Sequence, residues 1–69
     1  MPRTPLGDAA AWLRAGHERE ITIRWSAGRF EVRAWAATPA GWRDSKEADP
    51  DIGAAVELAL KAARQRGHL

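Results

Sequence analysis

Residues 20–36, which read EITIRWSAGRFEVRAWA, decide the fold of this chain. On both sides of the Ser-Ala-Gly-Arg segment, apolar and polar side chains alternate with the period of a β-strand that has one buried face. The Ser-Ala-Gly-Arg segment itself is typical of a tight turn. A turn there pairs Trp25 with Phe30 and Arg24 with Glu31, so that apolar meets apolar and charge meets opposite charge. The stretch therefore predicts an antiparallel hairpin in this register.

A third strand is predicted after the hairpin. Residues 38–41 read TPAG, which is turn chemistry, and residues 41–45 return alongside the hairpin as a short strand. A two- or four-residue turn places Trp42 on the same face of the sheet as Trp35, whereas a three-residue turn places Trp42 in the core. The sequence leaves both arrangements open.

A C-terminal helix is predicted from about residue 50. Asp49 is a good N-cap, Pro50 suits the first helical position, and Asp51 complements the positive end of the helix dipole. Gly67 offers a C-cap at the other end. Small and apolar residues recur at three- and four-residue spacing and form the stripe that packs on the sheet: Ile52, Ala55, Val56, Ala59, Leu60 and Ala63.

A short N-terminal helix is predicted to begin after Thr4, which a proline follows, and to run to Arg14 or Ala15, with Gly16 ending it. Its inward side is predicted to hold Leu6, Ala9, Ala10 and Leu13. The expected fold class is α+β, with a short N-terminal helix, a three-stranded antiparallel sheet and one C-terminal amphipathic helix packed on one face, in the order αβββα. Residues 1–69 are predicted to form a single small domain.

The core of this domain is expected to be thin. Of 31 hydrophobic residues in the chain, 15 are alanine, which leaves 16 with large side chains. Cysteine is absent, so neither a disulfide nor a thiolate zinc site can stabilise the fold. A partner or a second copy is therefore expected to add stability. The expected core joins the C-terminal helix to the hairpin through Ile52, Val56, Leu60, Ile21, Ile23, Phe30 and Val32.

Charge and hydropathy narrow the class of protein. The net charge of +2 is only mildly basic. Charged residues interrupt the first twenty positions, and no apolar run approaches the ~20 residues of a membrane span. The expected location is the cytoplasm, with no membrane association and no cofactor.

The sequence contains no persuasive catalytic constellation, and we expect no enzyme activity. The candidate nucleophiles and bases are not spaced as a triad: Thr4, Thr22, Ser26, Thr38, Ser45, His17 and His68. One carboxylate cluster precedes or begins the C-terminal helix, formed by Asp44, Glu47, Asp49 and Asp51. We interpret this cluster as helix capping rather than a calcium loop, because Pro50 and Ile52 interrupt the alternation of oxygen ligands.

Strand alternation predicts an open sheet face opposite the C-terminal helix. That face carries Thr22, Arg24, Glu31, Arg33 and Trp35. An exposed tryptophan beside arginines suits a protein interface or base stacking. The alternative is that Trp35 packs beneath the N-terminal segment, against Trp12 or Leu13. The candidate binding residues are Arg24, Arg29, Glu31, Arg33, Trp35 and Trp42.

The order of elements resembles the double-stranded-RNA-binding domain. Gly41, Ser45-Lys46, Ala54-Ala55 and Ala59-Leu60 are similar to that family's glycine, Ser-Lys stretch and final helix. The resemblance implies nucleic-acid binding, for which the available cations are Arg24, Arg29, Arg33, Lys61, Arg64 and Arg66. Where the family presents further lysines to phosphates, this chain has Glu47, Asp49, Pro50 and Asp51.

The hairpin followed by DPDIGAA at residues 49–55 also resembles small sheet-plus-helix accessory proteins of phages and mobile elements, among them anti-CRISPR proteins. This resemblance implies a small non-catalytic module that inhibits or adapts a larger host complex by binding a protein. We take protein binding as the leading hypothesis and nucleic-acid binding as the alternative. A homodimer is also expected, in which Trp35, Arg24 and Arg33 meet their own counterparts. Glu31 or Glu20 from the other subunit is then needed to compensate the repulsion between the arginines.

Overall fold

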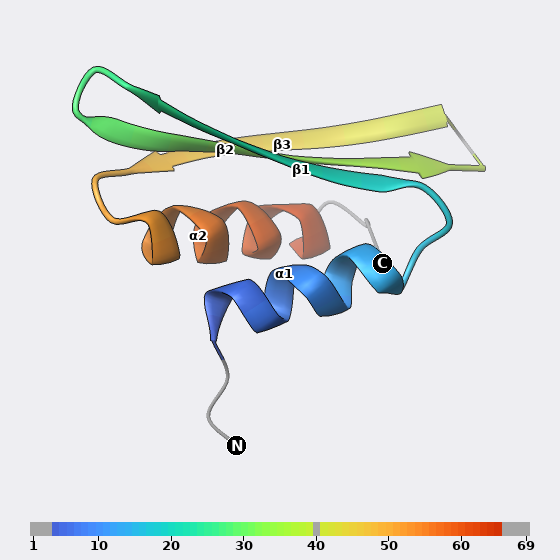
Figure 1. Cartoon of the computed structure of the whole chain (residues 1–69). Coiled ribbons are helices and arrows are strands. Elements are labelled where there is room, and N and C mark those ends of the chain that lie inside the picture. The colour runs from blue at the N-terminus through green and yellow to red at the C-terminus, as the bar shows by residue number, and fades with distance from the viewer. Residues whose placement is uncertain (1–3, 40, 66–69) are drawn as a thin grey trace.

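The computed structural model describes residues 4–39 and 41–65 and has the predicted αβββα order. Its elements are α1 (Pro5–Arg14), β1 (Arg19–Ser26), β2 (Arg29–Thr38), β3 (Gly41–Asp49) and α2 (Ile52–Gln65). The strands form one antiparallel sheet in the order β1-β2-β3, and both helices lie on the same side of it (Figure 1). No helix or strand of the described ranges covers the other side.

The hairpin forms in the predicted register. Trp25 lies opposite Phe30 and Arg24 lies opposite Glu31. The rings of Trp25 and Phe30 meet edge to face, with 4.7 Å between their centroids. The register predicted from side-chain alternation is therefore confirmed. Alternation specifies the register because a slip of one residue would move every side chain of the strand to the other face of the sheet.

The third strand extends to Asp49, four residues past its predicted end. Thr38 pairs with Gly41, so a two-residue turn connects β2 to β3. This register places Trp42 on the same face as Trp35, which resolves the alternative that the sequence left open. The strand continues through a charged segment because pairing with β2 overrides the low β-propensity of those residues.

Small side chains let α2 lie close against β2 and β3. The buried residues of α2 are Ala55, Val56, Ala59, Leu60 and Ala63, and those of the two strands are Val32, Ala34, Ala36 and Ser45. The Ser45 hydroxyl donates a hydrogen bond to the Ala59 carbonyl at 3.2 Å, so this buried polar group is satisfied. Of the ten buried hydrophobic residues that form the core of the described chain, six are alanine, which confirms a thin core.

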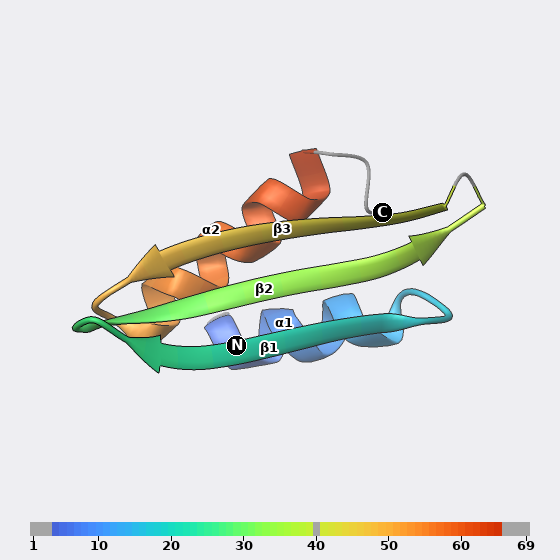
Figure 2. The same ribbon diagram turned by 90° about the horizontal axis from the view of Figure 1, so that it is seen from above.

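Two isoleucines expected in the core are exposed at its margin. Ile52 is 45% exposed and Ile23 is 44% exposed, so this part of the core prediction is wrong. In the described chain α2 contacts β2 and β3 but not β1, which lies to one side of that helix (Figure 2). Val56 and Leu60 are buried as predicted.

The first helix begins as predicted, and Ala9 and Leu13 lie on its inward side as expected, but Leu6 does not and Trp12 joins that side instead. The Thr4 hydroxyl accepts a hydrogen bond from the Gly7 N–H at 3.0 Å and caps the helix. Leu6, predicted to face inward, is 77% exposed, whereas Trp12 is buried. The Arg19 guanidinium lies 4.7 Å from the centre of the Trp12 ring and donates a hydrogen bond to the Trp12 carbonyl at 2.8 Å. Trp12, rather than Leu6, therefore anchors α1 to β1.

The N-cap of α2 is Asp51 rather than Asp49. The Asp51 carboxylate accepts a hydrogen bond from the Ala54 N–H at 2.8 Å, and the Asp49 carboxylate accepts one from the Asp51 N–H at the same distance. Pro50 therefore lies in the turn before the helix rather than at its first position. The C-cap expected at Gly67 lies outside the described residues.

We expect Val56→Asp to unfold the domain. Val56 is buried between α2 and the sheet, and an unpaired buried carboxylate costs several kcal/mol, comparable to the roughly 3–5 kcal/mol of net stability of a domain this small. Leu58→Asp, on an exposed position of the same helix, is the matched control and should leave far-UV circular dichroism and thermal unfolding nearly unchanged. A wild-type unfolding transition in the Val56→Asp protein would contradict the packing of α2.

The β1–β2 turn has a left-handed backbone at both of its central residues. Both of its residues have positive φ, 55° at Ala27 and 80° at Gly28, as in a type I′ turn. Asparagine tolerates this conformation better than alanine, so Ala27→Asn should raise the free energy of unfolding by about 0.5–1 kcal/mol. Gly28→Ala should lower it through backbone strain alone, since the added Cβ meets no atom within 4 Å. Urea midpoints that do not move in either variant would contradict the turn conformation.

Candidate binding face

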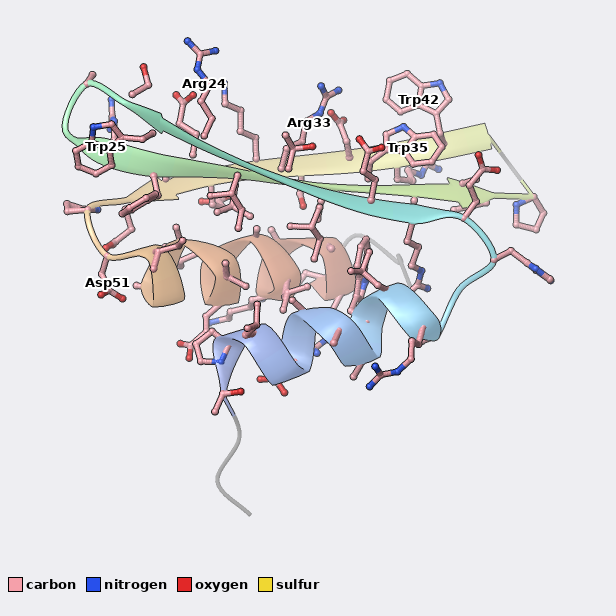
Figure 3. The ribbon with its side chains drawn as sticks, viewed as in Figure 1. Arg24, Trp25, Arg33, Trp35, Trp42 and Asp51 are labelled. Atoms are coloured by element: carbon pink, nitrogen blue, oxygen red, sulfur yellow. The ribbon has the colours of Figure 1, made fainter. Side chains whose placement is uncertain are left out.

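The uncovered side of the sheet, called the open face below, is the candidate binding site. Alternation along the three strands places on it Glu20, Thr22, Arg24, Arg29, Glu31, Arg33, Trp35, Trp42, Asp44 and Lys46. Figure 3 shows Arg24, Arg33, Trp35 and Trp42 projecting from the side of the sheet opposite the helices. All six candidate binding residues of the sequence analysis therefore share this face, with Arg29 at its hairpin end.

Two tryptophans lie together at the other end of the open face. The register sets Trp35 opposite Asp44 and Trp42 opposite Ala37, so the two indoles are diagonal neighbours on adjacent strands (Figure 3). Trp42 is 59% exposed, and Trp35 is partly buried. The alternative in which Trp35 packs beneath the N-terminal segment is wrong, because α1 lies on the opposite side of the sheet.

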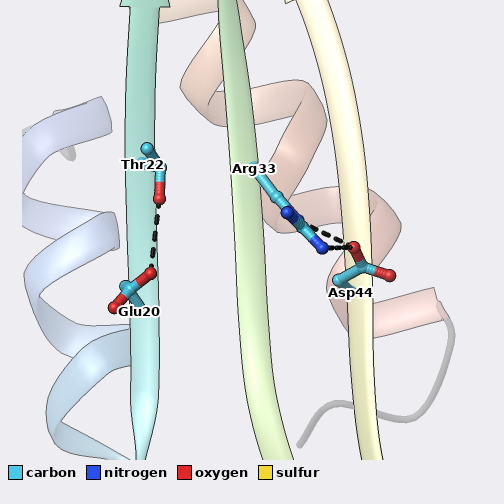
Figure 4. Close-up of polar contacts among 4 residues, drawn as sticks. All are labelled: Glu20, Thr22, Arg33 and Asp44. Carbon is cyan, nitrogen blue, oxygen red and sulfur yellow. Dashed lines mark hydrogen bonds and ion pairs between the residues drawn. The ribbon is translucent and has the colours of Figure 1, made fainter.

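Several charges on the open face are paired with one another. The Nε and Nη2 atoms of Arg33 lie 2.8 and 2.6 Å from the same Oδ2 atom of Asp44 (Figure 4). The Lys46 Nζ atom lies 3.9 Å from the Glu31 Oε2 atom. Both pairs are partly exposed to solvent, so they add little stability and mainly balance the charge of the face.

Arg24 differs from Arg33 in its surroundings. It is exposed and makes no ion pair with another described residue, because Glu31, which faces it across the strands, lies near Lys46. A shallow depression of about 450 Å³ lies beside it, open to solvent and lined by Thr22, Arg24, Glu31, Arg33, Asp44 and Lys46. Such a depression suits a side chain of a binding partner better than an enclosed small molecule.

The carboxylate cluster divides between two sides of the molecule. Asp51 caps α2 and Asp49 accepts a hydrogen bond in the turn just before it, so both lie at the helix start as the sequence predicts. Asp44 does not, because it lies on the open face and pairs with Arg33. Glu47 lies opposite Val32 on the helix-facing side of the sheet and makes no hydrogen bond with the start of α2 among the described residues. The capping interpretation is therefore right for two of the four carboxylates.

Lys46 is a residue of this face that the sequence analysis missed. Continuing the strand alternation past Ser45 would have placed it on the same face as Trp42. The low β-propensity of the following Glu-Ala-Asp segment ended the predicted strand too early.

Within residues 4–39 and 41–65, no three His, Cys, Asp or Glu side chains lie close enough together to hold a metal ion. Over the same ranges, neither helix has the length and apolar character needed to cross a membrane.

The chain was compared with protein-family models, with curated proteins and with solved structures. None of the three comparisons gave a match. The interpretation of the open face therefore depends on its own geometry and charge.

Proposed function

We propose that this chain is a small non-catalytic module that binds another protein through the open face. The observation that carries this proposal is the tryptophan pair, Trp35 and Trp42, on a sheet side that no described element covers. Tryptophan and arginine are among the side chains that contribute most to protein interfaces. Removing the exposed indole surface from water on binding is favourable, at roughly 25 cal/mol per Å² of apolar area.

The distribution of charge favours a protein partner over a nucleic acid. Arg33 and Lys46 lie beside Asp44 and Glu31, and carboxylates within a few ångströms of each cation repel phosphate. Interspersed charges of both signs next to an aromatic pair are typical of surfaces that recognise proteins by electrostatic complementarity.

The positions of the hydroxyl groups support a non-catalytic role. Ser45 is 2% exposed and its hydroxyl donates to the Ala59 carbonyl, so it is not placed to attack a substrate. Ser26 is the last residue of β1, whereas His17 comes before Arg19, the first residue of that strand, so the two residues lie at opposite ends of it. At about 3.3 Å per residue the two are on the order of 20 Å apart or more, too far for His17 to act as a base for Ser26.

The resemblance to accessory proteins of phages and mobile elements gives the proposal its more specific form. In that form the module is an anti-CRISPR-like inhibitor, or an adaptor, that acts in the cytoplasm on a larger host complex. A small module is compatible with such a role because binding requires a surface rather than an enclosed site.

Nucleic-acid binding is the second candidate, favoured by the αβββα order that the chain shares with the double-stranded-RNA-binding domain. The cations expected to carry it do not form one surface, however. Arg24 and Arg29 belong to the open face, whereas Lys61 and Arg64 belong to α2 on the other side of the sheet. This separation is a reason to rank the candidate second.

Affinity capture with variant baits tests the proposed function. We expect a host protein to be retained by the wild-type chain and to be lost, or bound at least about tenfold more weakly, with Trp42→Ala, because truncating an interface tryptophan typically costs more than 1.4 kcal/mol. Trp25→Ala is the matched control, since Trp25 is also 59% exposed but lies on the helix-facing side. Equal retention by the wild-type and Trp42→Ala baits would contradict a role of the open face.

Gel shifts with duplex and single-stranded DNA and RNA test the second candidate. If nucleic acid is the ligand, binding should be clear at ~50 mM salt and should weaken steeply as the salt concentration rises. We expect no shift at ~50 mM salt. A salt-sensitive shift that Arg24→Ala weakens would favour nucleic acid over protein.

A further inference from the structure

We propose that two copies of this chain associate through β1, so that their sheets join into one continuous antiparallel sheet. The proposal concerns the edge of the sheet rather than the open face, and it does not depend on the proposed function. Four observations carry it: unpaired backbone along β1, exposed apolar side chains beside it, a self-complementary order of side chains, and charges left available for pairing.

The backbone of β1 is available for pairing along its outer side. The strand order β1-β2-β3 makes β1 an edge strand among the described residues. The Ala37 N–H donates to the Glu18 carbonyl at 3.0 Å, which shows that the even-numbered residues of β1 bond β2. In an antiparallel strand, the backbone N–H and C=O groups of successive residues point alternately toward one neighbouring strand and toward the opposite side. The N–H and C=O groups of Ile21 and Ile23 therefore point outward, away from β2.

Apolar side chains near this edge are unusually exposed for so small a core. Ile23 is 44% exposed, Trp25 is 59% exposed and Leu6 is 77% exposed. Ile23 and Leu6 also line a groove of about 310 Å³, almost wholly apolar, together with Thr4, Pro5, Ile52, Gly53 and Val56. Burial of Ile23 by a second copy would add apolar contacts beside a core that contains few large side chains.

The order of side chains along β1 is complementary to itself. When two copies run antiparallel about Thr22, each Thr22 faces its counterpart and each Glu20 faces Arg24 of the other copy. On the helix-facing side, each Ile21 faces Ile23 of the other copy. A two-fold interface must match one surface to itself, and this register does so with two opposite-charge pairs and no like-charge pair.

The charges that this register requires are available. Arg24 makes no ion pair with another described residue. The contact of Glu20 within its own chain is a hydrogen bond of 3.5 Å from the Thr22 hydroxyl, at the limit for such a bond (Figure 4). Neither residue has to break an ion pair with a described residue to reach the second copy.

The other edge of the sheet is less suited to association. Around Ser45, β3 is also self-complementary, with Asp44 facing Lys46 of a second copy. Asp44 already pairs with Arg33 on β2, and Lys46 lies near Glu31 there, so a β3 interface would compete with these contacts. Charged residues along an edge strand are also a common protection against edge pairing.

The β1 interface differs from the dimer expected from the sequence, in which Trp35, Arg24 and Arg33 meet their own counterparts. Arg33 is bound to Asp44, and apposed open faces would bring like charges together. Joining the sheets edge to edge keeps the open faces of both copies free. The two-fold axis runs perpendicular to the sheet, so the helices of both copies lie on one side, where the exposed residues of α1 include the small Gly7 and Ala11.

Reciprocal charge variants test this interface by analytical ultracentrifugation over a concentration series. We expect the wild-type chain to dimerise and Glu20→Arg and Arg24→Glu each to weaken the dimer by more than about tenfold, because each variant creates two like-charge pairs. Mixing the two variants in equal amounts should restore association as a heterodimer. One chain then carries a positive charge at both positions and the other a negative charge at both, so opposite charges face each other again. Restoration also shows that both variant chains are folded.

Lys46→Glu is the matched control, because Lys46 lies on the same face of the sheet but at the opposite edge. It should dimerise like the wild-type chain. A wild-type chain that stays monomeric at concentrations up to ~1 mM would overturn the proposal. A dissociation constant of ~1 mM corresponds to a binding free energy of only about −4 kcal/mol. Loss of the dimer in Lys46→Glu with no effect of the β1 variants would overturn it equally and would assign the interface to β3.

Discussion

The close approach of α2 to the sheet is the contact on which the rest of the structure depends. Alanines on both sides of this contact, including Ala34 and Ala59, bring the helix near enough for a strand side chain to reach its backbone. Close packing of small side chains gives many dispersion contacts for little side-chain volume, which is how so thin a core holds together. The same contact fixes α2 over β2 and β3 and leaves β1 to be covered by another element.

The first helix supplies that cover, but incompletely. The stacking of Arg19 on Trp12 ties α1 to the start of β1, and α1 also contacts α2. The far end of β1, with Ile23 and Trp25, receives less cover. Because both helices lie on one side of the sheet, no described element covers the other side, and Trp42 stays at the surface.

Much of the fold was predictable because strand alternation is a strong constraint when one face is buried. The register of Arg24 against Glu31 follows from it directly. The burial of Trp12 on α1 was not predictable in the same way, since hydropathy does not represent the stacking of an arginine on its ring. The exposure of Ile23 depends on how α2 crosses the sheet, which a single helical stripe does not specify.

The candidate site was predictable in its residues but not in its contacts. Alternation assigns the arginines and Trp35 to one face, and the structure places Trp42 with them. The pairing of Arg33 with Asp44 depends on the turn between β2 and β3, whose length the sequence left open. A diagonal contact between strands therefore becomes visible only when the register of the third strand is known.

The position of α2 as the last described element has a consequence for synthesis of the chain. Each strand pairs with the one that precedes it, so the sheet can assemble from local contacts as the chain emerges from the ribosome. Its apolar side, including Val32, nevertheless has no cover from α2 until residues near Leu60 have been added. The nascent chain therefore passes through a stage in which the strands exist without the helix that stabilises them, and stable folding waits until α2 has been synthesised and can pack on the sheet.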